Sequence, residues 1–88
     1  MVKVSVITVV RNAAAELERT LSNLAALDRS AAEREVIVID GASTDGTPAV
    51  IKRYESLISY SVSEPDGGLY DAMNKGIRAA TGDYLWFV

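Results

Sequence analysis

A single carboxylate, Asp40, directly follows the branched apolar run "VIVI" at residues 36–39 and precedes a string of small polar residues. Two cations accompany it, Arg11 after an earlier apolar run and Lys75 in a helix-like stretch. A carboxylate can accept hydrogen bonds from a base edge or from ribose hydroxyls, and cations can face a diphosphate. The three residues therefore indicate a nucleotide site. A plain turn-capping carboxylate is the alternative for Asp40.

Three other chemistries that use glycines or an acidic residue after a strand each lack a necessary residue. A dinucleotide site needs a glycine fingerprint after the first strand, but residues 9–16 read "VVRNAAAE". A phosphate loop would share the spacing of Gly41 and Gly46, but it needs a lysine where Thr47 stands. A phospho-accepting receiver needs a pair of carboxylates after the first strand, where this chain reads "VRN". We therefore reject all three.

Composition narrows the class of protein. The 88 residues carry a net charge of −3 and contain neither cysteine nor histidine. The negative charge argues against a nucleic-acid or anionic-membrane partner, and the missing side chains exclude disulfides, thiolate metal sites and imidazole bases. The apolar run at residues 2–10 is too short to span a bilayer, and no signal-peptide cleavage site follows it. We expect a protein of the cytoplasm or of the cytoplasmic membrane face, with one domain over residues 1–88.

The chain stops on the apolar residues "YLWFV" at 84–88, with no polar tail after them. A last strand normally passes into a solvated tail, so we expect the chain to be a piece of a longer protein. An apolar strand left at the edge of a sheet seeks a partner. This pattern predicts self-association through residues 84–88.

Apolar patterns predict four strands and three helices that alternate along the chain. The first two strands are continuously apolar, as in strands covered on both faces, whereas the third alternates with serines, as at a sheet edge. The predicted strands are 2–10, 36–39, 58–63 and 84–88, and the predicted helices are about 13–27, 48–56 and 69–80, with a polar connection at 28–35.

Local signals fix the ends of these helices. Asn12 offers an N-cap side chain to the first helix, and Thr47 offers a capping hydroxyl before Pro48 at the start of the second. Within the third helix, Gly76 is expected to allow close approach to the sheet. Gly82 is expected to end that helix as a left-handed cap.

Alternating strands and helices predict a parallel sheet between helices, which is a three-layer α/β fold. Right-handed crossovers and an edge position for the third strand favour the order 3-2-1-4. The chain then reverses direction between the first and fourth strands, and ligands bind at the carboxyl ends of strands near such a point. Asp40 ends the second strand beside it, and residues 8–12 end the first.

Three segments resemble the N-terminal half of the family-2 nucleotide-sugar glycosyltransferases of GT-A fold. They are "VSVITVVRN", "VIVIDGASTDGT" and "SEPDGGLYDAMNKGIRAATGDYLWF", in the family's order and spacing, and they cover nearly the whole chain. The resemblance implies a Rossmann-like domain with a mostly parallel sheet. It also implies a nucleotide-sugar donor, usually a UDP-sugar, and inverting transfer to an acceptor hydroxyl in polysaccharide biosynthesis.

By this resemblance, eight residues form the nucleotide site. The strand-1 residues line the pocket, Asp40 hydrogen-bonds the base, and the others lie in the following loop or face the donor. The eight are Thr8, Arg11, Asn12, Asp40, Ser43, Asp66, Asn74 and Lys75. Many family members carry an aromatic residue in place of Arg11, whose guanidinium can also stack on a base.

Several of these residues also have a purely structural explanation. Asn12 could act only as a helix cap, Asp66 only as a turn residue, and Lys75 only as a solvated charge. Asp71 near the helix start favours the helix dipole. The aromatic pair Trp86-Phe87 is assigned to the core or to a partner surface, not to sugar stacking.

The family's metal-holding acidic motif and its catalytic base would lie beyond Val88. In such enzymes the acceptor hydroxyl attacks the anomeric carbon, a base removes its proton, and a divalent metal stabilises the departing diphosphate. The full-length enzyme is therefore expected to use manganese or magnesium, whereas these residues hold no metal and no catalytic group. We expect no transferase turnover from them alone. The alternative is a non-catalytic α/β binding module or an excised scaffold without activity.

Overall fold

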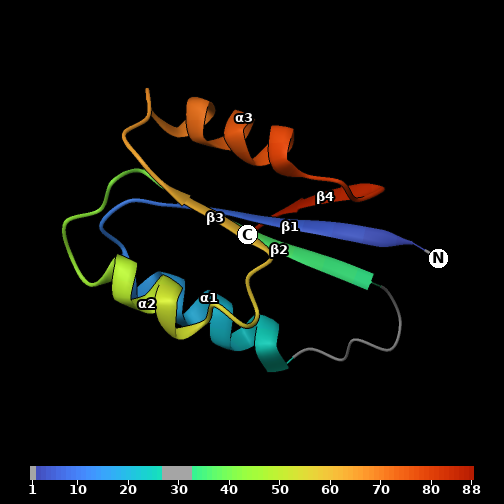
Figure 1. Ribbon diagram of the computed structural model, residues 1–88, viewed down its shortest axis with the longest axis horizontal. Helices are drawn as coiled ribbons and strands as arrows, with labels where there is room; N and C mark the ends of the chain where they lie inside the picture. Colours follow the sequence, from blue (N-terminus) through green and yellow to red (C-terminus); the bar gives the residue numbers. More distant parts are fainter. Residues whose placement is uncertain (1, 27–32) are drawn as a thin grey trace.

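In the described part of the chain, four parallel strands form one sheet, flanked by three helices (Figure 1). A computed structural model describes residues 2–26 and 33–88 of the chain. The strands are β1 (Lys3–Val10), β2 (Glu33–Asp40), β3 (Tyr60–Ser63) and β4 (Tyr84–Phe87), and the helices are α1 (Ala14–Ala26), α2 (Thr47–Arg53) and α3 (Leu69–Ala79). The strand order β3-β2-β1-β4, with every pair parallel, confirms the predicted topology.

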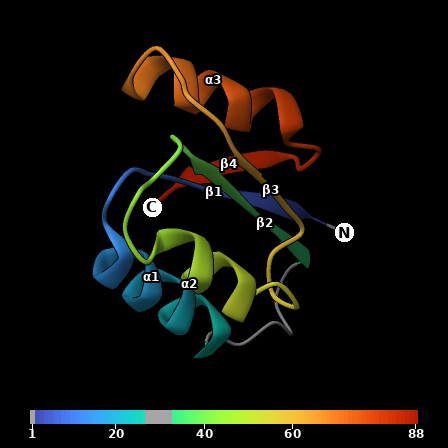
Figure 2. The same ribbon diagram turned by 60° about the vertical axis from the view of Figure 1, so that its left-hand side comes forward.

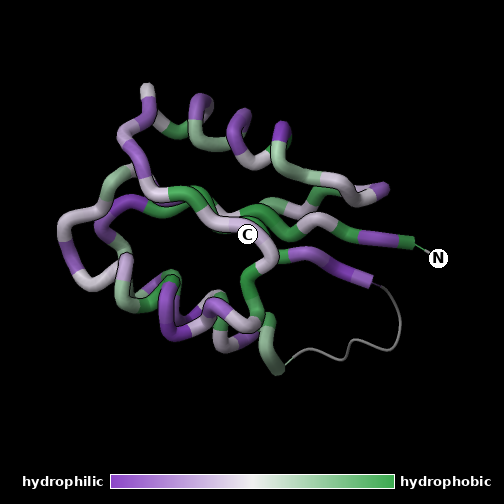
Figure 3. The backbone as a smooth tube through the Cα atoms, viewed as in Figure 1, coloured by the Kyte–Doolittle hydropathy of each residue, from purple (hydrophilic) through white to green (hydrophobic). Residues whose placement is uncertain are grey.

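The sheet separates two apolar layers. Helices α1 and α2 cover one face and α3 covers the other (Figures 1 and 2). Because side chains alternate across a strand, the valines of β2 pack toward α1 and α2, and its isoleucines pack toward α3. The apolar strands accordingly run between helices whose outer faces are hydrophilic (Figure 3). Within the described residues, no helix has the length and apolar character needed to cross a membrane.

Gly76 and Gly82 each allow another backbone segment to pack closely against the sheet. This role was predicted for Gly76, whereas Gly82 was predicted to end a helix. A Cβ added at Gly76 would lie 2.5 Å from Cγ2 of Ile7, which confirms that this glycine admits α3 to the sheet. The prediction for Gly82 is wrong, because the positive φ among described glycines belongs to Gly68 instead. Gly82 packs against β1, where an added Cβ would lie 2.8 Å from the backbone nitrogen of Ser5.

One strand boundary and one core assignment also need correction. Strand β2 begins at Glu33, so residues 33–35 belong to the sheet and not to the polar connection. They pair in register with the first residues of β1, which no local pattern reveals. The rest of that connection and Leu27 lie outside the described residues. Trp86 and Phe87 are 47% and 38% exposed, so they are not core residues, and the predicted role of β4 in self-association stays a prediction.

One carboxylate, Asp45, caps two helices. Its Oδ2 accepts the N–H of Ala14, the first residue of α1, at 3.2 Å. Its Oδ1 accepts the N–H of Thr47 at 2.9 Å and the Thr47 hydroxyl at 2.6 Å at the start of α2. The predicted capping roles of Asn12 and Thr47 are therefore wrong, because Asp45 supplies the acceptor for both helix ends. The hydrogen bonds from Thr47 hold the pKa of Asp45 below its ordinary value.

A second carboxylate, Glu35, joins the amino ends of three strands. It accepts the Ser5 hydroxyl at 2.7 Å and the Thr81 N–H at 2.7 Å, and Lys3 lies 3.9 Å away. Burial raises the pKa of Glu35, but the hydrogen bonds from Thr81 and Ser5 and the charge of Lys3 outweigh it, so the pKa lies below its ordinary value.

Acid is therefore expected to destabilise the fold through Glu35 and Asp45. A group with a lowered folded pKa contributes stability above its unfolded pKa and loses that contribution as the pH falls through the folded value. The loss should begin near the ordinary values of 4.5 for Glu35 and 3.8 for Asp45 and continue below them. Urea unfolding at a series of pH values should show a shallower acid slope in the Glu35→Gln/Asp45→Asn variant. Glu55→Gln is the control, and an unchanged slope in the double variant would contradict the assignment.

Candidate functional site

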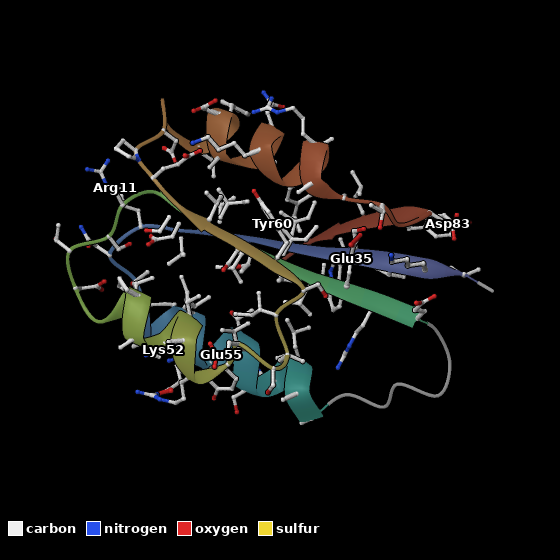
Figure 4. The ribbon with its side chains drawn as sticks, in the orientation of Figure 1. Arg11, Glu35, Lys52, Glu55, Tyr60 and Asp83 are labelled. Carbon is white, nitrogen blue, oxygen red and sulfur yellow. The ribbon has the colours of Figure 1, made fainter. Side chains whose placement is uncertain are left out.

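A hollow of about 220 Å³ opens where β1 ends and α3 begins. This position is the carboxyl edge of the sheet, beside the point where the chain direction reverses, and it is where such folds bind ligands. The loop residue Arg11 lies at this end of the molecule, opposite Asp83 at the far end (Figure 4). The lining residues are Val9, Val10, Arg11, Asp66, Gly68, Leu69 and Ala72.

Two oppositely charged residues, Arg11 and Asp66, both lie close to Gly41. A Cβ added at Gly41 would lie 3.0 Å from Oδ2 of Asp66 and 3.6 Å from Cδ of Arg11. No ion pair within 4.0 Å joins Arg11 to Asp66 or to another acid in residues 2–26 and 33–88. The absence of a side chain at position 41 therefore lets the Asp66 carboxylate and the aliphatic part of Arg11 lie close to the same backbone position.

The start of α3 is already occupied by the protein's own carboxylates. Oδ1 of Asp66 accepts the N–H of Gly68 at 3.1 Å, and Oδ2 of Asp71 accepts the N–H of Gly67 at 2.8 Å. A helix N-terminus attracts anions through free N–H groups and the helix dipole. These two bonds engage the N–H groups just before Leu69 and place two negative charges at the helix start, so this side of the hollow suits a neutral hydrogen-bonding group better than a phosphate.

Asp40 lies fully buried behind the hollow. Its Oδ1 accepts the Ser43 hydroxyl in a short hydrogen bond and the Ser43 N–H at 3.3 Å, and its Oδ2 accepts the Ser63 hydroxyl at 2.8 Å. The carboxylate thus joins the end of β2 to β3 and to the loop after β2. Direct contact between Asp40 and a base would require neighbouring residues to move, because the side chain is fully buried, so that role stays a prediction.

Ser43 and Asn12 connect Asp40 to the loop that carries Arg11. The Asn12 N–H donates to Oγ of Ser43 at 2.8 Å, and Oδ1 of Asn12 accepts the Thr44 N–H at 2.7 Å. Asn12 and Ala42 adopt φ values of 51° and 58°, a left-handed conformation that non-glycine residues seldom occupy. Such backbone strain persists where surrounding contacts enforce it and is common at ligand sites.

Of the eight predicted site residues, Arg11 and Asp66 line this hollow, Asn12, Asp40 and Ser43 are linked behind its loops, and the other three lie elsewhere. Thr8 is buried and donates to the carbonyl of Val88 at 3.1 Å, on the side of β1 that faces a different hollow under α1. Lys75 bonds the segment after β3 and lines a hollow between β3 and α3. Asn74 is exposed on α3.

Sequence reasoning missed the apolar wall of the site. Val9 and Val10 were assigned only to a strand, and Leu69 and Ala72 only to a helical stripe, yet all four line the hollow. Their positions could have predicted this role, because they are the last two residues of a strand and lie in the first turn of a helix near the predicted switch point. The wall offers apolar surface to a planar ring, and Arg11 and Asp66 offer a hydrogen-bond donor and acceptor at its rim.

The described residues contain no group of three acidic side chains that converge as metal ligands. A divalent cation would therefore need ligands other than a cluster of acidic side chains from the described residues. The arrangement can bind and orient a planar polar group.

The family model described as "Glycosyl transferase family 2" matches residues 5–88. An uncharacterized glycosyltransferase of Mycobacterium tuberculosis is 48% identical over 85 residues, which is 97% of this chain and 32% of that protein. TarS of Staphylococcus aureus, a poly(ribitol-phosphate) beta-N-acetylglucosaminyltransferase, is 32% identical over 91 residues, which is 100% of this chain and 16% of that protein. The chain thus spans about a third of the first relative and less of the second.

Solved structures of similar proteins share the fold. The mannosyltransferase PcManGT of Pyrobaculum calidifontis, in complex with GDP-Man and Mn2+, has a TM-score of 0.83 and 36% identity over 93% of this chain and 25% of its own. TarS residues 1–349 in complex with UDP-GlcNAc has a TM-score of 0.79 and 30% identity over 98% of this chain and 26% of its own. Both are GT-A glycosyltransferases, so the predicted fold class is confirmed.

Proposed function

The chain belongs to glycosyl transferase family 2, and on that premise we propose that its hollow binds the nucleotide of a nucleotide-sugar donor. The single observation that carries this proposal is that Arg11 and Asp66 line one hollow at the carboxyl edge of the sheet, both against Gly41, without an ion pair between them. Two structurally similar proteins were solved with nucleotide-sugars, one with GDP-Man and one with UDP-GlcNAc. These neighbours support the ligand class.

The hollow suits the nucleoside end of such a donor. A uracil ring presents an N–H between two carbonyl groups, so Asp66 could accept from the ring while Arg11 donates to a carbonyl. A guanine edge offers the same two kinds of group. The charges therefore favour either base over one that lacks an N–H beside a carbonyl, and we propose a UDP-sugar, in keeping with the resemblance.

The diphosphate would then extend toward the Arg11 side. The carboxylates of Asp66 and Asp71 lie at the start of α3, so among the residues that line the hollow the guanidinium of Arg11 is the positive group that can face a diphosphate. We propose that sugar transfer by the longer protein is inverting, that it uses a divalent metal held by residues outside this chain, and that it takes place in the cytoplasm. Residues 1–88 alone are expected to show no turnover.

Calorimetric titration with UDP and with GDP tests the proposal. Asp66→Asn and Arg11→Met should each weaken the preferred nucleotide about tenfold, ~1.4 kcal/mol, because each leaves one ligand group unpaired. Glu55→Gln and Lys52→Met remove the same charges from the exposed end of α2, away from Arg11 (Figure 4), and should leave affinity unchanged. Equal losses in the control pair, or no binding of either nucleotide at millimolar concentration, would contradict the proposal.

A further inference from the structure

Lys75 contacts residues 64–65, the segment that directly precedes Asp66. Its Nζ donates to the carbonyl oxygen of Pro65 at 3.2 Å and lies 3.1 Å from Oε1 of Glu64. Only 17% of the Lys75 side chain is exposed. It lines a hollow of about 420 Å³ between β3 and α3, separate from the hollow that Arg11 and Asp66 line.

The segment that Lys75 holds is also fixed from its other side. The N–H of Glu64 donates to the carbonyl of Asp40 at 3.0 Å, which continues the pairing of β3 with β2. The Pro65 carbonyl belongs to the same planar peptide group as the nitrogen of Asp66. A bond from Lys75 to that oxygen therefore fixes the orientation of the peptide plane from which Asp66 projects.

We propose that Lys75 is a positioning residue, which strengthens nucleotide binding by holding Asp66 in place and does not contact the diphosphate. This inference rests on the proposed function of the hollow. Two of the three N–H donors of the ammonium group already have partners in residues 64–65, and Lys75 is not among the residues that line the hollow of Arg11 and Asp66. The arrangement thus differs from the direct contact that the sequence predicts for Lys75.

Arg78 provides a matched control. It lies on the same helix and lines the same hollow, but it is exposed and has no side-chain hydrogen bond or ion pair with the residues described. Arg78→Met therefore removes the same unit of charge as Lys75→Met without releasing the Pro65 carbonyl. A general electrostatic effect on an anionic ligand would appear in both variants.

The test is a double-mutant cycle between Lys75→Met and Asp66→Asn, with uridine and UDP as separate probes in calorimetric titrations. Lys75→Met should weaken the binding of uridine and of UDP by the same factor, about five- to tenfold, because both ligands carry the uracil N–H that Asp66 would accept. In the Asp66→Asn background the same substitution should change affinity less than about twofold. Lys75→Arg should restore most of the affinity, because its guanidinium can reach both partners.

Other results would overturn the inference. A loss for UDP with none for uridine would show direct contact with the diphosphate. An equal loss in Arg78→Met would show a general charge effect, and a full loss that persists in the Asp66→Asn background would show a route other than Asp66. Failure of the unsubstituted chain to bind either probe is a different pattern, which overturns the proposed function together with this inference. Melting temperatures of all variants show whether each remains folded.

Discussion

Asp40→Ala is expected to lower the free energy of unfolding by about 3 kcal/mol or more and to abolish nucleotide binding. The substitution removes a fully buried acceptor, so the hydroxyls of Ser43 and Ser63 lose the carboxylate to which they donate. It also releases Ser43 from β2, and the Ser43 hydroxyl oxygen accepts the Asn12 N–H in the loop that carries Arg11. Urea unfolding and UDP titration of the same sample measure the two effects.

Asp40→Asn separates two explanations for that loss. An asparagine keeps the shape of the side chain, can still accept from Ser43 through its oxygen and can donate to the Ser63 hydroxyl. If Asp40 acts by holding the loop, this variant should lose only about 1 kcal/mol of stability and bind UDP within a few-fold of the unsubstituted chain. Loss of all UDP binding with unchanged stability would instead show that the carboxylate contacts the base, as the sequence predicts.

Gly82→Ala is expected to detach β4 from the sheet. The added Cβ would lie 2.6 Å from Oγ of Ser5, 2.8 Å from the Ser5 nitrogen and 3.0 Å from the carbonyl oxygen of Lys3. A side chain can rotate away, but the backbone of β1 is fixed between β2 and β4. Overpacking of this kind costs about 1–3 kcal/mol or more, and it would also break the hydrogen bond from the Gly82 N–H to Ser5.

Thermal unfolding and amide hydrogen exchange test this expectation. The variant should melt at lower temperature, and the amides of β4 should exchange much faster than those of β2. Gly67→Ala is the control, because its Cβ would meet nothing closer than 3.7 Å. Equal melting temperatures and protected β4 amides in Gly82→Ala would contradict the close packing described here.

The strand order could be predicted because it depends on local patterns. Continuous apolar residues mark the central strands, and the serines at 61 and 63 mark β3 as an edge, so few topologies remain. The cap of α1 could not be predicted, because Asp45 is 31 residues from Ala14. The role of Gly82 could not be predicted either, since a glycine after a helix can serve either a left-handed turn or a close approach of two backbones.

The candidate site was predictable in place but not in detail. The position of Asp40 at the carboxyl end of β2 follows from the sequence, and so does the presence of Arg11 and Asp66 near the switch point. Whether a carboxylate faces a ligand or its own serines depends on side-chain packing between β2, β3 and the following loop. For the same reason the sequence could not show that Lys75 is turned toward Pro65.

The most direct test of the site is a map of amide chemical shifts in the 15N-labelled chain as UDP is added. The account predicts shifts concentrated at residues 9–11 and 66–69, which border the hollow between β1 and α3. The amides of Lys52 and Glu55 on the α2 side should not move. Shifts confined to the hollow beside Tyr60 and Arg78, or none at millimolar UDP, would contradict the claim that Arg11 and Asp66 bind the donor nucleotide.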